Sequence, residues 1–106
     1  MGQRDREKGL YGKFNVHRND GRDAPGGDKA GAHYYVLDLT HDPFALPALA
    51  VYAYMCRNAF PPLAADLWAY LAVWQEAHGT LEVPGFTEME PGRFEPISTQ
   101  PAGGQT

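Results

Sequence analysis

The sequence predicts an α+β fold: a two-stranded antiparallel β-hairpin packed against an antiparallel pair of α-helices, with an extended C-terminal arm. Two observations lead to this class. Two short segments rich in branched and aromatic residues flank a glycine-rich loop, and two longer apolar segments then carry helix-start and helix-end signals. A chain of 106 residues, 43% hydrophobic and 21% charged, is suited to one small folded domain.

The N-terminal part is expected to hold both strands. Residues 1–9 are charged and unpatterned, which predicts a flexible end. Between residues 10 and 18 apolar and polar side chains alternate, as in a half-buried strand. Glycines and a proline in residues 19–32 predict a long loop, and HYYVLDL at 33–39 has the composition of a second strand that pairs with the first.

A first helix is expected to follow directly. Asp42 can cap the free N–H groups of a helix whose first residue is Pro43, and the apolar pattern continues to about Asn58. A proline inside a helix deletes one hydrogen bond. Pro47 therefore predicts either a distorted first turn or a regular helix that begins nearer Leu46.

The second helix is expected over residues 62–78, started by Pro61-Pro62 and ended by Gly79. So short a connection predicts that the two helices are antiparallel. The ββαα domain thus spans residues 10–79. On the second helix the sequence predicts one main apolar face, made of Leu63, Leu67, Tyr70, Leu71 and Trp74, with Trp68, Ala72 and Val73 outside it.

The helical segment is more apolar than one hairpin can cover. Between Pro43 and Trp74 the only formal charges are Arg57 and Asp66. Contiguous exposed apolar surface is uncommon on monomers, so we expect a homodimer or another protein partner. The residues expected at that interface are the aromatic side chains Tyr54, Trp68, Trp74 and Phe86.

The stretch after the helices allows two interpretations. Residues 80–97 are expected to form the extended arm, and residues 98–106 a flexible tail. Alternatively, the arm folds back and covers the helices itself. The side chains available for this are Leu81, Val83, Phe86, Phe94 and Ile97.

Charge and cysteine content limit the partners. Residues 31–106 carry two basic residues against eight acidic ones, which argues against direct binding of nucleic acid. The single Cys56 has apolar neighbours, so we expect a buried thiol and a cytoplasmic protein. The charge-free run from Pro43 to Cys56 is fourteen residues long, shorter than the ~18–20 residues of a membrane-spanning helix.

One group of side chains could ligate a metal ion, and one loop could hold a phosphate. The metal-capable residues His33 and Asp38 point to opposite faces of the expected strand, and no established metal-ligand spacing is present. Neither a metal nor a cofactor is expected. The other two members of the metal-capable group are His41 and Asp42.

The glycine-rich loop lacks the lysine that a P-loop requires, and its aspartates would repel phosphate. It is interpreted as a flexible contact loop, with Arg22, Asp23 and Asp28 as the contacting residues. Cys56 lies in an apolar helix and Ser98 in the expected tail, so neither is a credible nucleophile. The sequence therefore predicts a protein that is not an enzyme.

The segments GRDAPGGDKAGAHYYVLDLTHDPFA, ALAVYAY and LAADL are similar to a pattern in short proteins of bacteriophages and prophages of GC-rich hosts. The resemblance covers roughly residues 11–70. Ala32 and Phe44 depart from it, because more polar residues are expected there. It implies a phage-encoded accessory protein in the bacterial cytoplasm, and it supplies no catalytic or binding residue.

The function expected from these observations is protein–protein interaction. The more specific hypothesis is that the protein inhibits a bacterial defence complex. An acidic surface can engage the basic channel through which a nuclease binds its substrate. Two alternatives stay open. One is a virion or assembly component that donates its arm as a strand to a neighbour. The other is a small metal- or nucleotide-dependent enzyme centred on His33, Asp38, His41 and Asp42.

Overall fold

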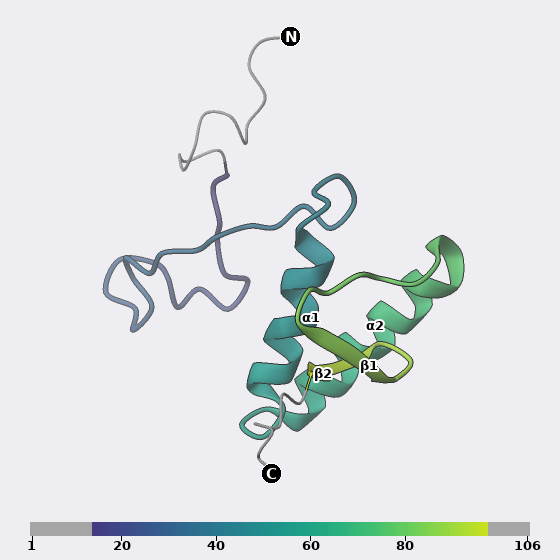
Figure 1. Cartoon of the computed structure of the whole chain (residues 1–106). Helices are drawn as coiled ribbons and strands as arrows, with labels where there is room; N and C mark the ends of the chain where they lie inside the picture. The colour runs from purple at the N-terminus through teal and green to yellow at the C-terminus, as the bar shows by residue number, and fades with distance from the viewer. Residues whose placement is uncertain (1–13, 98–106) are drawn as a thin grey trace, which may run out of the picture. The chain divides into compact units, whose positions relative to one another are not determined.

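The structure, a computed structural model, describes residues 14–97; the two ends expected to be flexible, 1–9 and 98–106, lie outside this range. Contacts divide the chain into two units, Met1–Val36 and Leu37–Thr106. Within the described residues every helix and strand belongs to the second unit. In chain order these elements are α1 (Ala45–Cys56), α2 (Pro61–His78), β1 (Phe86–Glu90) and β2 (Arg93–Pro96) (Figure 1).

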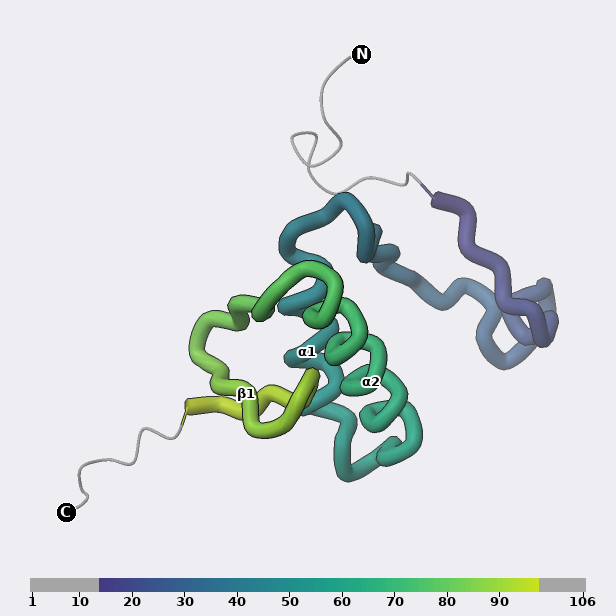
Figure 2. Tube along the Cα trace, turned by 90° about the vertical axis from the view of Figure 1, so that its right-hand side faces the viewer, coloured from purple at the N-terminus to yellow at the C-terminus, as the bar shows by residue number. Residues whose placement is uncertain are grey.

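The predicted α+β class is confirmed, but the hairpin lies in a different part of the chain. β1 and β2 pair antiparallel, with an irregularity between Glu88 and Glu90. α2 runs back alongside α1, and the hairpin lies against one side of this helix pair (Figures 1 and 2). The residues expected to form an extended arm therefore supply the β layer. The fold-back alternative predicted that these residues cover the helices, but it did not predict strands in them.

The prediction of strands over residues 10–18 and 33–39 is wrong for the parts that the structure describes. Residues 14–18 and 32–38 have no regular secondary structure, and most of their side chains are exposed. Branched and aromatic residues favour a strand only where neighbours supply both ladder hydrogen bonds and cover. Here neither is present, so composition alone does not produce a sheet.

α1 begins at Ala45 instead of Pro43, and its N-cap residue Phe44 makes no capping hydrogen bond through its side chain. Asp42 closes a turn ahead of the helix, since its Oδ1 accepts a hydrogen bond from the N–H of Phe44 at 2.9 Å. The later start explains why Pro47 is tolerated. It is the third helical residue, and N–H groups of the first turn have no acceptor within the helix.

The other helix boundaries agree closely with the sequence. α2 begins one residue earlier than predicted, and Gly79 follows its last residue as predicted. α1 ends at Cys56, two residues before the predicted end at Asn58, and the Cys56 side chain is buried as expected. Proline therefore marks the start of α2, whereas in α1 it occupies the first turn without marking the first helical residue.

Two Pro-Gly pairs delimit β1. Pro84-Gly85 forms a turn in which the N–H of Phe86 donates to the carbonyl of Val83 at 2.9 Å. Pro91-Gly92 is the two-residue connection between β1 and β2. Gly85 and Gly92 have φ angles of 82° and 80°, which a type II turn requires at its third position and which glycine adopts without strain. These pairs are the sequence signal for the hairpin.

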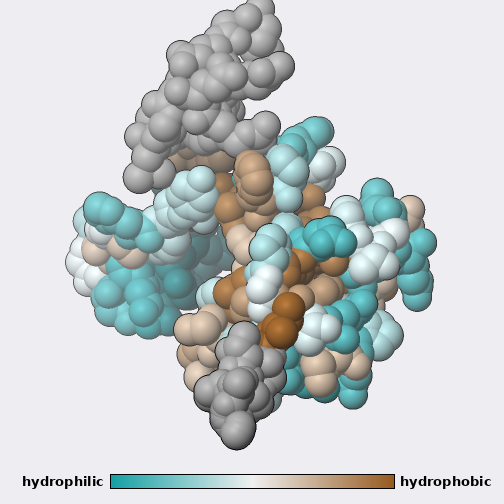
Figure 3. All heavy atoms as spheres, viewed as in Figure 1, coloured by the Kyte–Doolittle hydropathy of each residue, from teal (hydrophilic) through white to brown (hydrophobic). Residues whose placement is uncertain are grey.

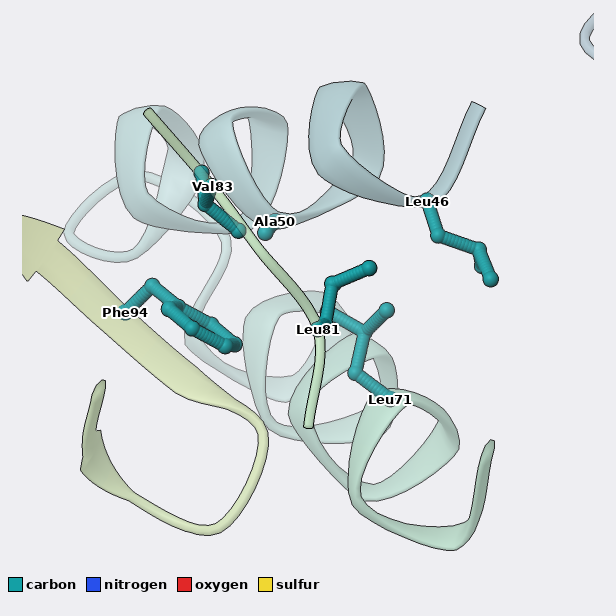
Figure 4. Packing of buried hydrophobic residues seen from close by; sticks show 6 residues of the cluster. All are labelled: Leu46, Ala50, Leu71, Leu81, Val83 and Phe94. Atoms are coloured by element: carbon teal, nitrogen blue, oxygen red, sulfur yellow. The ribbon is translucent and has the colours of Figure 1, made fainter. Parts of the chain in front are cut away.

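The hydrophobic core joins the helices to the segment that follows them. Both helices, the chain between α2 and β1, and β2 each contribute side chains that converge in Figure 4. None of the buried side chains in residues 14–97 is polar or charged. The six core residues are Leu46, Ala50, Leu71, Leu81, Val83 and Phe94.

A polar network fixes the hairpin on α2. The Gln75 side chain accepts a hydrogen bond from the N–H of Leu81 at 2.7 Å and donates to Glu88 Oε2 at 2.6 Å. The same carboxylate oxygen accepts from the N–H of Gly92 at 2.9 Å. The turn at Gly92 lies directly on the backbone of α2. A Cβ atom added at Gly92 would stand only 2.0 Å from the carbonyl oxygen of Trp68, so there is room for glycine alone.

This contact predicts different effects at two glycines with the same backbone conformation. Gly85→Ala should lower the free energy of unfolding by about 1 kcal/mol, the cost of a positive φ angle, because nothing lies within 4 Å of the place its methyl group would occupy. Gly92→Ala should lower it by about 3 kcal/mol, since overpacking against α2 is added to that strain. Urea unfolding monitored by tryptophan fluorescence measures both, and equal losses would contradict the close approach.

Candidate protein-binding surface

The residues considered for metal binding do not form a three-ligand cluster. Asp38 Oδ2 lies 2.9 Å from His41 Nδ1, while Asp38 Oδ1 accepts from the N–H groups of Thr40 and His41. These hydrogen bonds hold the pKa of Asp38 below its usual range, and the His41 side chain contributes most to that shift. Asp42 is used in the turn before α1, and His33 belongs to the other unit. Within residues 14–97 no three His, Cys, Asp or Glu side chains are placed to hold a metal ion.

The charges of the predicted contact loop are largely paired with one another. The Arg22 guanidinium forms a two-pronged ion pair with Asp28. The backbone N–H of Arg22 donates to Asp20 Oδ1 at 3.0 Å. Arg18 pairs in the same way with Asp20, at 2.9 and 2.6 Å. Asp23 lies 3.8 Å from His17. The loop is thus tied together by local ion pairs, and a role in contacting a partner stays a prediction.

An open pocket of about 380 Å³ lies within the N-terminal unit. Its lining brings His17 and Asp23 together with the ring of Tyr34, and the other lining side chains are apolar or amide. The remaining lining residues are Phe14, Asn15, Val16, Gly31 and Ala32.

The four aromatic residues predicted at an interface all have partners inside the folded unit. The rings of Tyr54 and Phe86 meet edge to face with centroids 5.7 Å apart, and Arg57 lies 3.9 Å above the Tyr54 ring. Trp74 packs against the core and stacks on His78. Trp68 lies under the hairpin turn, and its buried indole N–H has no hydrogen-bond acceptor among residues 14–97. Their role at a partner interface stays a prediction.

The most exposed apolar side chains of the helices are not the four predicted aromatics. On α1, Tyr52 and Met55 are 51% and 71% exposed, and together with Ala48 they lie opposite the buried face of the helix. These three residues form the α1 outer face. The helix carries no charged residue at all. Figure 3 shows the contrast with the N-terminal unit, whose loop is covered by hydrophilic residues.

α2 has a second exposed apolar stripe. Its buried face contains Ala64 and Leu71, so the face predicted from the largest side chains is partly wrong: Leu63 and Tyr70 point outward. The hairpin turn packs on α2 at Trp68 and Ala72, which lie outside the predicted apolar face. The buried side of α2 is therefore turned toward these residues and away from Leu63 and Tyr70. One set of exposed α2 positions recurs at alternating intervals of three and four residues. They are Leu63, Asp66, Tyr70, Val73 and Ala77, here called the α2 seam.

Comparison with protein-family models, with curated proteins and with solved structures gives no match to this chain. Among residues 14–97, neither helix is both long and apolar enough to cross a membrane.

The loop ion pairs predict a conformational change in acid. Hydrogen bonds from Arg18, and then from the N–H of Arg22, lower the pKa of Asp20 to about 2, and Arg22 lowers that of Asp28. Because a folded-state pKa below the unfolded one stabilises the structure at higher pH, the loop should keep its conformation above about pH 4 and lose it as the pH falls toward 2.

Carboxyl and amide chemical shifts, followed by NMR from pH 6 to 1.5, test this expectation. Asp20 should titrate near 2, and Arg18→Gln should return its pKa toward the usual value. An Asp20 that titrates in the usual range of an aspartate carboxyl would rule out the paired loop.

Proposed function

We propose that this protein is a non-enzymatic accessory protein that acts by binding another protein. The observation that carries the proposal is the uncharged helix α1, whose outer face exposes Tyr52 and Met55 to solvent. An exposed charged face is the usual way to keep a surface helix soluble, and α1 lacks it. Burial of such a face against a partner removes apolar area from water and so favours association.

We further propose that the protein is of the phage or prophage type and blocks a bacterial defence complex. Two observations support this more specific role. The resemblance of the segments between residues 21 and 67 to short phage proteins supports the origin. The charge balance supports the target, because from Leu37 onward two basic residues stand against eight acidic ones. Such a surface attracts the basic channel of a nuclease.

The described residues give less support to the two alternatives, a virion or assembly component and a small metal- or nucleotide-dependent enzyme. Strand donation by a virion component needs an extended segment that is free to pair with a neighbour, whereas residues 86–96 form a hairpin with each other. A metal-dependent enzyme needs converging ligands, and Asp38 and His41 lack a third one among the described residues. Protein binding is therefore the role with the most support.

Variants of Met55 test the proposal. The full chain is co-expressed in a bacterial host that carries a nuclease-based defence system, and complexes are measured by size-exclusion chromatography with light scattering. The unmodified chain should elute in a complex and restore phage infection. Met55→Glu should reduce affinity at least tenfold, equivalent to about 1.4 kcal/mol, because a carboxylate would have to be buried.

Two controls keep this result interpretable. Met55→Leu preserves an apolar side chain and should retain the complex. Thr87→Glu adds the same charge at an exposed position of β1 and should have no effect. If the chain is always a free monomer, or if Met55→Glu acts no differently from Thr87→Glu, the α1 outer face is not a binding surface and the proposal fails.

A further inference from the structure

The α2 seam has the spacing of a helix that packs on another helix. Its five positions alternate at intervals of three and four residues, which is the repeat of coiled-coil contact positions. Leu63, Tyr70 and Val73 are 40%, 45% and 65% exposed, so each leaves a large part of its surface open to solvent. From Leu63 to Ala77 the seam extends about 21 Å, or two heptads.

Asp66 is the only charged residue in the seam, and its position determines which occupants fit. The carboxylate is exposed and forms no ion pair within residues 14–97. It lies one turn from both Leu63 and Tyr70, so a helix seated on those apolar residues would also cover the carboxylate. Covering an unpaired carboxylate is costly, whereas a cationic group from the partner offsets the cost.

A second copy of this chain does not meet that requirement. In a parallel arrangement Asp66 would face Asp66 of the other copy, and like charges repel. In an antiparallel arrangement about Tyr70, Asp66 would face Val73 and be buried without a partner. The rest of the unit, with its two basic and eight acidic residues, adds repulsion between copies and attraction toward a cationic partner.

We infer that the α2 seam binds an amphipathic helix of another protein, one whose apolar positions repeat every three to four residues and include a lysine or arginine opposite Asp66. The inference rests on the proposed function, since it adds to the α1 outer face a second binding surface on α2 and gives the chemistry by which that surface binds. A side-by-side helix crossing at about 20° would let two heptads of the partner contact the seam. Apolar contacts supply affinity, and the Asp66 pair fixes the register.

Two designed peptides test this inference on the full-length chain. Each is a 21-residue amphipathic helix with leucine and isoleucine at the contact positions. One carries a single lysine at the position meant to face Asp66, and the other carries glutamate there. Fluorescence anisotropy should show the lysine peptide binding at least tenfold more tightly than the glutamate peptide, with the difference reduced by added salt.

Charge reversal at Asp66 separates a specific pair from general attraction. Asp66→Lys should invert the preference, so that the glutamate peptide binds more tightly. Glu76→Lys makes the same charge change at an exposed α2 position outside the seam, and it should leave the preference unchanged. Val73→Lys should abolish binding of both peptides. Circular dichroism of each variant checks that the exposed substitutions leave the fold intact.

Three results would overturn the inference. One is equal binding of the two peptides, or no binding of either. Another is an identical response to Asp66→Lys and Glu76→Lys. The last is a wild-type dimer that Val73→Lys converts to a monomer, since the occupant would then be a second copy. In the co-expression assay, loss of the complex in Met55→Glu but not in Val73→Lys would refute the seam while leaving the proposed function intact.

Discussion

The approach of the Gly92 turn to the backbone of α2 determines how the rest of the folded unit is arranged. A side chain at this position would collide with the carbonyl of Trp68. The close contact also places Glu88 where it can accept hydrogen bonds from both Gln75 and Gly92. With the hairpin fixed in this way, Phe94 of β2 is buried between the helices and the segment that follows them. One small residue thus sets the register between the α and β layers.

The same arrangement explains why both helices remain apolar on their outer sides. A two-stranded hairpin of nine residues covers one side of the helix pair only. The core can use Ala50 and Leu71, but it cannot reach Met55 or Val73 on the far sides. The sequence nevertheless keeps those positions apolar. The surplus of apolar residues visible in the sequence is therefore real, and its location follows from where the hairpin docks.

Helix-level features could be predicted from the sequence because they depend on local backbone chemistry. Free N–H groups explain the prolines at both helix starts, and Gly79 ends α2 as expected. Strand positions could not be predicted from composition, since HYYVLDL has strand residues but no neighbour. The Pro-Gly pairs were the available signal. The predicted interface aromatics Trp68 and Trp74 proved to be partly enclosed for different reasons. The hairpin turn docks at Trp68, whereas Trp74 packs against the core and stacks on His78.

The two basic residues of the folded unit are engaged locally, which leaves most of its acidic charge unbalanced. Arg93 is engaged with Glu90 and Glu95, which flank it along the hairpin. Arg57 donates to the carbonyl of Tyr54 and lies over its ring, so it neutralises no carboxylate. These are the only two basic residues after Lys29. The acidic residues of the helices therefore have no cation within the described unit to balance them. Under the proposed function, this field would attract a cationic partner before contact, and the apolar faces would then determine where it binds.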